Sequence, residues 1–230
     1  MTLATVGTAE TGTLPAVRRA VIFDLDGVIV DSFAVMEEAF AIAYREVVGE
    51  GEAPFEEYRR HQGRYFPDIM RIMGLPLEME EPFVRESYRL APQVPVFDGI
   101  GELLPALRAR GFKLAVATGK AGERARSLLD ELGLLSFFDH VIGSDEVARP
   151  KPAPDIVEHA LALLGLSPDE AVMVGDAPTD IASARGAGVA SAAALWAEVD
   201  DEEALLASGP GTVLHRPAEL LALCPAVPRV

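Results

Sequence analysis

The chain has 230 residues, half of them hydrophobic, and a single cysteine, so it can bury a large core but cannot form an internal disulfide. Its net charge of −16, without any block of Lys or Arg, argues against nucleic acid or a membrane surface as a partner. No apolar run approaches the roughly 20 residues of a membrane span. We expect a cytoplasmic protein in which residues 1–16, rich in Thr, Gly and Ala, form a flexible tail.

The first predicted element is a short buried strand, Ala20–Phe23, and carboxylates follow it directly. Asp24 and Asp26 lie two positions apart, so on an extended chain their side chains point the same way. Carboxylates held so close repel each other unless a cation lies between them or one keeps its proton. The pattern indicates a hard metal ion, a nucleophile with an acid/base partner, or both. The alternative is that the two acids only cap a turn and the next helix.

Residues 32–93 show helical spacing of apolar residues and no strand-like alternation. Glycine and proline divide this stretch into predicted helices at 33–48, 55–61, 65–73 and 82–91. An all-helical insert directly after the first strand predicts a lid, so we assign residues 33–96 to a helical cap domain with hinges near Ser32 and at 94–96.

After Gly99 the pattern alternates between helices and strands. The predicted strands are 113–117, 140–142, 171–174 and 189–194, and the predicted helices are 100–110, 121–132, 152–164, 178–185, 200–207 and 217–223. This alternation predicts an α/β core, formed by residues 17–32 and 97–230, with a parallel sheet covered on both faces. Ligands of such sheets bind beyond the carboxyl ends of the strands.

A hydroxyl and a glycine follow the strand at 113–117. Thr118 and Gly119 precede a predicted helix, and a hydroxyl beside the free N–H groups of a helix start can bind phosphate oxygens. A plain helix cap explains Thr118 as well. Lys120 can contact the ligand, but in the first turn of a helix it is more often solvated, which is our expectation.

The later strand ends carry a cation and two further acids. Lys151 lies between two prolines, which fix its backbone, so it is predicted to neutralise Asp24 and a phosphate rather than to serve solubility. Asp176 ends the strand at 171–174, and Asp180 lies one turn into the next helix. Both offer oxygen ligands to Mg²⁺, although each acid can also act as a helix cap.

Taken together, Asp24-Leu25-Asp26-Gly27-Val28, Thr118, Lys151 and Gly175-Asp176-x-x-x-Asp180 resemble the motifs of the haloacid dehalogenase superfamily of aspartate-nucleophile phosphotransferases. The resemblance covers nearly all of residues 19–216, and the helical insert is similar to the type 1 cap of phosphoglycolate phosphatases and β-phosphoglucomutase. It implies a Rossmann-like α/β core with an inserted all-helical cap. It also implies Mg²⁺ as the cofactor and a small phosphorylated molecule as the substrate, and we expect a monomer or a homodimer.

The resemblance also implies a role for each motif residue. Asp24 attacks phosphorus to give an aspartyl-phosphate, and Asp26 protonates the leaving alcohol and then activates water. Thr118 and Lys151 bind the remaining phosphate oxygens. The implied metal ligands are Asp24, Asp26 through its backbone carbonyl, Asp176, and Asp180 acting through water or on Lys151.

The loop at residues 61–68 joins two cap helices and is the predicted specificity loop. It offers His61, Arg64 and Tyr65 to the substrate, together with Gly119 of the core, although His61 can also be an ordinary helix-end residue. A phosphomutase must retain a bisphosphate intermediate and so needs extra cap cations. The candidates for this role, or else solvated helix charges, are Arg60, Arg64 and Arg71.

Two reactions of the superfamily are disfavoured by the sequence. Dehalogenases lack an acid at the position of Asp26, and phosphonate hydrolases use a cap lysine that residues 33–96 do not contain. We predict Mg²⁺-dependent hydrolysis of a small phosphomonoester, with a β-phosphoglucomutase-like phosphomutase as the alternative and a regulatory protein with a degenerate site as a third hypothesis.

The substrate is less well defined by the motifs. Thr118-Gly119 departs from the Thr-Asn that is common in housekeeping phosphoglycolate phosphatases. Residues 63–70, 143–146 and 149–151 also resemble the phosphatases associated with 3-amino-5-hydroxybenzoate synthesis. That resemblance implies a phosphorylated sugar or amino-sugar precursor.

Overall fold

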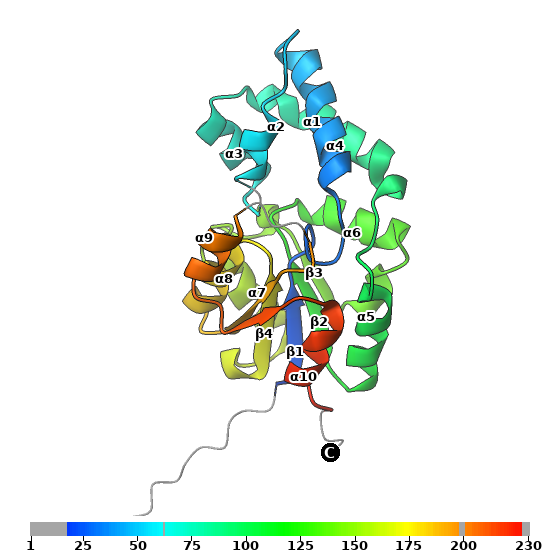
Figure 1. The fold of residues 1–230 in the computed structure, drawn as a ribbon, viewed down its shortest axis with the longest axis vertical. Helices are drawn as coiled ribbons and strands as arrows, with labels where there is room; N and C mark the ends of the chain where they lie inside the picture. The colour runs from blue at the N-terminus through cyan, green and yellow to red at the C-terminus, as the bar shows by residue number, and fades with distance from the viewer. Residues whose placement is uncertain (1–17, 62, 198–200, 227–230) are drawn as a thin grey trace, which may run out of the picture.

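The computed structural model describes residues 18–61, 63–197 and 201–226, so the predicted N-terminal tail lies outside the described residues. Figure 1 shows a sheet flanked by helices at one end of the molecule and a group of four helices at the other. Among the described residues, no helix is long and apolar enough to cross a membrane.

The described residues form a six-stranded, fully parallel sheet with the order β3-β2-β1-β4-β5-β6. The strands are β1 (Ala20–Phe23), β2 (Lys113–Ala117), β3 (His140–Ile142), β4 (Ala171–Gly175), β5 (Ala190–Ala194) and β6 (Thr212–Leu214). The predicted parallel α/β sheet is therefore confirmed. The edge strand β6 was not predicted.

Successive residues of each strand pack on opposite faces of the sheet, as the pleat requires. Val21 and Phe23 belong to a hydrophobic cluster with α5 (Ile100–Ala109) and α6 (Gly122–Glu131). Ala20 and Ile22 belong to a second cluster with α7 (Asp155–Leu164) and α8 (Pro178–Gly186). Helices cover both faces of the sheet, so its strand ends are the accessible part (Figure 1).

Three helices of the core differ from their predicted bounds by more than one residue at an end. The helix predicted at 152–164 begins only at Asp155, because Lys151 and Ala153 each precede a proline, and that position disfavours helical backbone. The C-terminal helix divides into a 3₁₀ turn (Pro217–Glu219) and α10 (Leu220–Leu223). The preceding helix, α9 (Glu202–Ala207), begins where the Asp201 carboxylate accepts the Ala204 N–H at 2.8 Å.

The remaining four helices form a separate group, here called the helical segment. It comprises α1 (Phe33–Val47), α2 (Phe55–Arg59), α3 (Phe66–Met73) and α4 (Glu80–Leu90). These helices share a hydrophobic cluster of their own, in which the rings of Phe66 and Phe83 stack with centroids 4.5 Å apart and Phe40 packs on Tyr58. The assignment of residues 33–96 to a separate domain stays a prediction.

Two extended connections join the helical segment to the sheet, and they lie side by side. The Asp31 N–H donates to the Pro95 carbonyl at 2.9 Å, and the Phe97 N–H donates to the Ile29 carbonyl at 3.1 Å. Val30 and Val96 form an antiparallel bridge between these bonds. The two passages of the chain therefore share one narrow junction, which is where hinges were predicted.

Candidate active site

Polar side chains from four loops meet at the carboxyl ends of the central strands. Asp24 follows β1, Thr118 follows β2, Lys151 precedes α7, and Asp176 follows β4. All four are buried, as is Asp180 in the first turn of α8. Because β1 pairs with both β2 and β4, residues that are far apart in the sequence become neighbours. The predicted motif residues are thus brought together.

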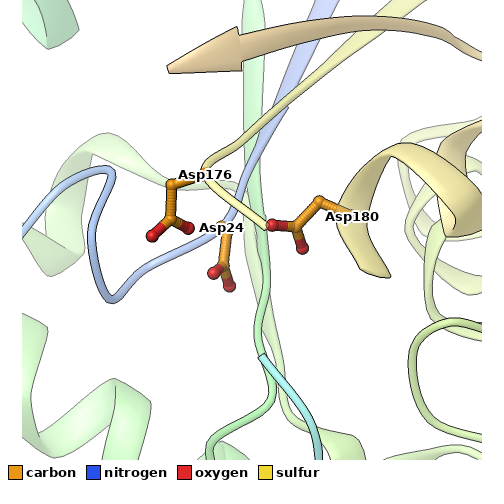
Figure 2. Close-up of side chains that lie close together, drawn as sticks. All are labelled: Asp24, Asp176 and Asp180. Carbon is orange, nitrogen blue, oxygen red and sulfur yellow. The ribbon is translucent and has the colours of Figure 1, made fainter. Parts of the chain in front are cut away.

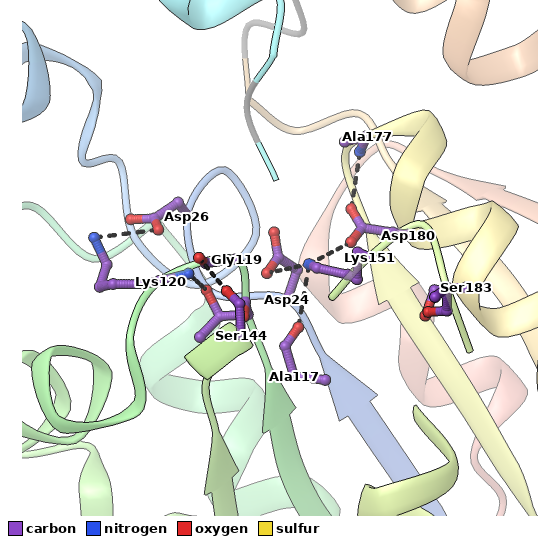
Figure 3. Close-up of polar contacts among 12 residues, drawn as sticks. Asp24, Asp26, Ala117, Gly119, Lys120, Ser144, Lys151, Ala177, Asp180 and Ser183 are labelled. Carbon is purple, nitrogen blue, oxygen red and sulfur yellow. Dashed lines mark hydrogen bonds and ion pairs between the residues drawn. The ribbon is translucent and has the colours of Figure 1, made fainter. Parts of the chain in front are cut away.

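Lys151 connects three of these loops. Its Nζ donates to Asp24 Oδ1 at 2.9 Å, to Asp180 Oδ1 at 2.6 Å and to the Ala117 carbonyl at 3.2 Å (Figure 3). An ammonium group has three donors, so these three bonds fix its orientation. Burial lowers the pKa of Lys151, but Asp180 and Asp24 outweigh burial and the pKa is raised above its usual range. Lys151 is therefore held as a cation in the interior.

Three carboxylates crowd around this cation. Asp24, Asp176 and Asp180 each have an oxygen within 4.8 Å of the others (Figure 2). Burial, opposed by Lys151, raises the pKa of Asp24 to about 7. Burial also raises the pKa of Asp176 well above its usual range, and Asp24 and Asp180 add to the effect. One lysine does not neutralise three acids, so this group is suited to a further cation.

Two glycines make room for these carboxylates. A Cβ on Gly27, whose φ is +80°, would lie 2.0 Å from Asp176 Oδ2. A Cβ on Gly175 would lie 2.2 Å from the Cβ of Asp180. The carboxylates can therefore lie this close together only if the residues at Gly27 and Gly175 have no side chain.

Asp180 serves both as a helix cap and as a partner of Lys151. Its Oδ2 accepts the Ala177 N–H at 3.0 Å, at the start of α8, while its Oδ1 accepts from Lys151. The sequence allowed Asp180 to be a helix cap or to act on Lys151, and the structure shows that it does both. The cap fixes the carboxylate that positions the lysine.

Asp26 lies apart from the three clustered carboxylates. Its Oδ1 accepts a hydrogen bond of 2.5 Å from Ser32 Oγ, and its Oδ2 forms an ion pair with Lys120 Nζ at 3.3 Å. The expectation of a solvated Lys120 in the first turn of a helix is wrong. Lys120 precedes α6, and its side chain is only 8% exposed because the helical segment covers it.

Thr118 is not the cap of α6. Its Oγ1 accepts the Lys120 N–H at 3.2 Å, whereas the first N–H of α6, at Gly122, donates to Asp145 Oδ1 at 2.8 Å. Ser144 Oγ donates to the Thr118 and Gly119 carbonyls and so fixes the turn. Because the Thr118 hydroxyl is the acceptor in its bond with Lys120 N–H, its proton is available to a ligand.

The predicted specificity loop lies directly over this turn. A cavity of about 50 Å³ between them is lined by Asp24 and Thr118 of the core and by Arg64 and Tyr65 of the loop. His61 is not among its lining residues, so its predicted contact with the substrate has no support. Of the other predicted cap cations, Arg60 and Arg71 are exposed, and Arg71 is paired with Asp68.

The contact between loop and core is made by backbone. A Cβ on Gly119 would lie 2.6 Å from the Gly63 carbonyl oxygen, and a Cβ on Gly63 would lie 2.8 Å from the buried Thr179 Oγ1. Gly119 therefore permits a close approach of the two backbones and also lines the cavity, and its predicted contact with the substrate stays a prediction.

Replacing Gly119 by Ala should hold the loop away from the core and lower kcat/KM by about 100-fold, the loss expected for a misplacement of about 1 Å. Steady-state kinetics would measure this effect. Gly101→Ala is the matched control, because its Cβ would meet no atom within 4 Å. Equal kinetics of the two variants would contradict the close approach described here.

Further residues of the site gave no clear signal in the sequence. Tyr58, Phe83 and Arg124 also line the cavity. The two aromatic residues have the helical spacing of core residues, and Arg124 is one of several charges on α6. Only the packing of the helical segment over α6 reveals their position.

Sequence comparisons place the chain among phosphatases. The model of the haloacid dehalogenase-like hydrolase family matches residues 21–194. The chain is 34% identical to a probable phosphatase, IndB, of Dickeya dadantii, over 87% of this chain and 91% of that protein. It is 33% identical to a phosphoglycolate phosphatase of Aquifex aeolicus, over 89% of this chain and 96% of that protein. It is 32% identical to a pyrophosphatase, PpaX, of Bacillus pumilus, over 88% of this chain and 94% of that protein. The resemblance to 3-amino-5-hydroxybenzoate phosphatases finds no support among these relatives.

Solved structures agree with this placement. CbbY of Rhodobacter sphaeroides, determined with phosphate, is 25% identical with a TM-score of 0.79, covering 90% of this chain and 99% of that one. A putative β-phosphoglucomutase of Thermotoga maritima is 26% identical with a TM-score of 0.70, covering 89% of this chain and 97% of that one. The family model spans more than half of the sequence. The chain belongs to the haloacid dehalogenase-like hydrolases.

Proposed function

We propose that the protein is a Mg²⁺-dependent phosphatase that hydrolyses a small phosphomonoester through an aspartyl-phosphate on Asp24. The observation that carries the proposal is the buried Lys151 ammonium, which holds Asp24 beside Asp176 and Asp180 at the edge of a cavity. A carboxylate fixed in this way is oriented for attack, and the cation offsets the charge of an incoming phosphate. The relatives named as phosphatases support the same reaction.

The acidic cluster fits a divalent cation. Its donors are carboxylate oxygens, which Mg²⁺ prefers, and burial makes their ionisation costly without a cation. Asp24, Asp176 and the backbone carbonyl of Asp26 would hold the ion, with Asp180 acting through water. When bound, the ion supplies positive charge that offsets the carboxylates and the phosphate.

The side chains of this chain account for the remaining steps. The Asp24 oxygen that Lys151 does not bind attacks phosphorus, and the bond from phosphorus to the leaving oxygen breaks. Asp26, oriented by Ser32 and Lys120, donates a proton to that oxygen. The same carboxylate then takes a proton from the water that attacks the aspartyl-phosphate, which releases inorganic phosphate and frees Asp24. Thr118 donates its hydroxyl proton to a phosphate oxygen.

We further propose that residues 33–96 act as a cap. Arg64 and Tyr65 line the cavity from this side, and closure would exclude bulk water from the reacting phosphate. The paired connections at 29–31 and 95–97 supply a compact hinge.

Removing divalent metal with EDTA should lower the release of inorganic phosphate by at least about 100-fold, because the acidic cluster would be left without its neutralising charge. Added Mg²⁺ should restore the rate. A colorimetric phosphate assay over a panel of small phosphomonoesters measures both effects. Undiminished hydrolysis in EDTA would overturn the metal-dependent mechanism.

A phosphomutase is the second candidate, favoured by Arg64 at the cavity and by the structural likeness to a putative β-phosphoglucomutase. Phosphorus NMR of a hexose 1-phosphate distinguishes the two. Conversion to the 6-phosphate without free phosphate would favour the mutase, and accumulation of inorganic phosphate would favour the phosphatase.

A further inference from the structure

A second pair of cations lies at the cavity, and neither is used to hold Asp24. Arg124 and Lys120 are both buried, at the start of α6 and just before it. The Arg124 guanidinium lies over the ring of Phe83, 5.1 Å from its centroid, and donates to Ser87 Oγ at 3.2 Å. Both partners belong to α4 of the helical segment. Arg124 thus lies at the contact between the two parts of the molecule.

The charge of Arg124 is poorly compensated. A guanidinium has five N–H donors, yet within the described residues the side chain makes one hydrogen bond, to a neutral hydroxyl, and no ion pair. Burial lowers the pKa of Arg124. Asp26 and Glu80 in the same cavity oppose this effect, but within the described residues neither forms an ion pair with Arg124, so the guanidinium keeps donors free for an anion that enters the cavity.

Arg124 and Lys120 lie close to the residues proposed to react with the substrate. Arg124 and Lys120 line the same cavity as Asp24 and Asp26. Figure 3 shows Asp26 and Lys120 on one side of Asp24, and Lys151 with Asp180 on the other. Asp26 is the proposed proton donor to the leaving oxygen, so its side of Asp24 is where the leaving part of a substrate lies. Lys120, paired with Asp26, therefore lies on the side of the leaving group, and Arg124 lines the same cavity.

We propose that Arg124, assisted by Lys120, forms a subsite for a second anionic group, a carboxylate or a second phosphate, carried by the leaving part of the substrate. The proposal rests on the proposed function, because it defines the leaving group of the same reaction. Because Arg124 and Lys120 line the same small cavity as Asp24, this anionic group belongs to the same small molecule as the reacting phosphate. Tyr58 and Phe83 form apolar walls around it.

If Arg124 had only a structural role, its substitution would have a different effect on the substrates than if it bound an anion. If the guanidinium only joins α6 to α4 through Phe83 and Ser87, its loss should impair all substrates equally. If it binds an anion, its loss should impair anionic substrates selectively. The test therefore compares matched substrates, rather than the activity of one.

The experiment measures kcat/KM with two pairs of substrates: phosphoglycolate against 2-hydroxyethyl phosphate, and pyrophosphate against methyl phosphate. Wild-type protein should prefer the anionic member of at least one pair by about 30-fold, the value of a hydrogen bond to a charged group. The pair that shows the preference identifies a carboxylate or a phosphate as the second group. Arg124→Gln should remove most of the preference and change the neutral substrate less than about 3-fold, and Arg124→Lys should retain part of it.

Arg126→Gln is the matched control, since Arg126 lies on the same helix but bonds Glu146 and the Val141 carbonyl at the surface. It should leave the preference unchanged. Equal hydrolysis of both members of each pair by wild type, or an equal loss of both in Arg124→Gln, would overturn the subsite and leave the phosphatase proposal intact. Hydrolysis of none of the four substrates would overturn both. If Arg124→Gln does not fold, the wild-type preference and Arg124→Lys decide the question.

Discussion

Asp24→Asn should abolish phosphate release, with a loss of about 10⁴-fold or more, because an amide cannot form the aspartyl-phosphate. The change keeps the size of the side chain and removes one of three crowded acids, so the fold should survive. Initial rates with the best substrate of the panel give the effect. Acid quenching with a ³²P-labelled substrate should trap radioactivity on wild-type protein and none on the variant.

The matched control for this prediction is Asp130→Asn, on the exposed end of α6. It makes the same chemical change away from the cavity and should keep wild-type rates. If Asp24→Asn released phosphate at the control's rate, Asp24 would not be the nucleophile, whatever holds the metal.

Lys151→Met should damage both stability and turnover. The lysine is the shared partner of Asp24 and Asp180, and its removal leaves buried carboxylates without their cation. Breaking a buried pair in this way costs about 3–5 kcal/mol. Urea unfolding, followed by circular dichroism, measures that loss, and kcat should fall by about 10³-fold because a fixed cation next to the reacting phosphate is lost.

A double-mutant cycle separates the pairing from other effects of Lys151. Asp24→Asn in the Lys151→Met background removes one of the stranded charges, so the double variant should be more stable than Lys151→Met alone, with a coupling energy of about 1–3 kcal/mol. Lys113→Met is the control, since Lys113 donates only to the Leu164 carbonyl near the surface and should cost about 1 kcal/mol. Unchanged stability of Lys151→Met would refute the role assigned to this contact.

Much of the core was predictable because its signals are local. The strands at 20–23, 113–117 and 140–142 have the predicted bounds, since each is an apolar run that ends at a polar motif. Once the strands are parallel neighbours, their carboxyl ends must meet, so the motif residues converge without further information. The edge strand β6 was missed although it is as long as β3, because Gly209-Pro210-Gly211 directly before it is typical of a loop.

The cap side of the site was less predictable, because burial there depends on contacts between distant segments. Lys120 is an ordinary helix-start lysine until the helical segment covers it and Asp26 pairs with it. Arg124 is likewise defined by Phe83 and Ser87, which no spacing rule connects to α6. His61 has the composition expected of a specificity loop but does not line the cavity.

The central place of β1 has a consequence for synthesis. β1 comes before the other five strands of the described sheet in the chain, yet it lies between β2 and β4. Its partner β4 emerges about 150 residues later, roughly 7 to 30 s at typical elongation rates. During that interval one edge of an apolar strand lacks its hydrogen-bonding partner, which is the condition that favours aggregation. A nascent chain therefore cannot assemble its reactive centre until β4 is made, and β1 is the segment that ribosome-associated chaperones must shield.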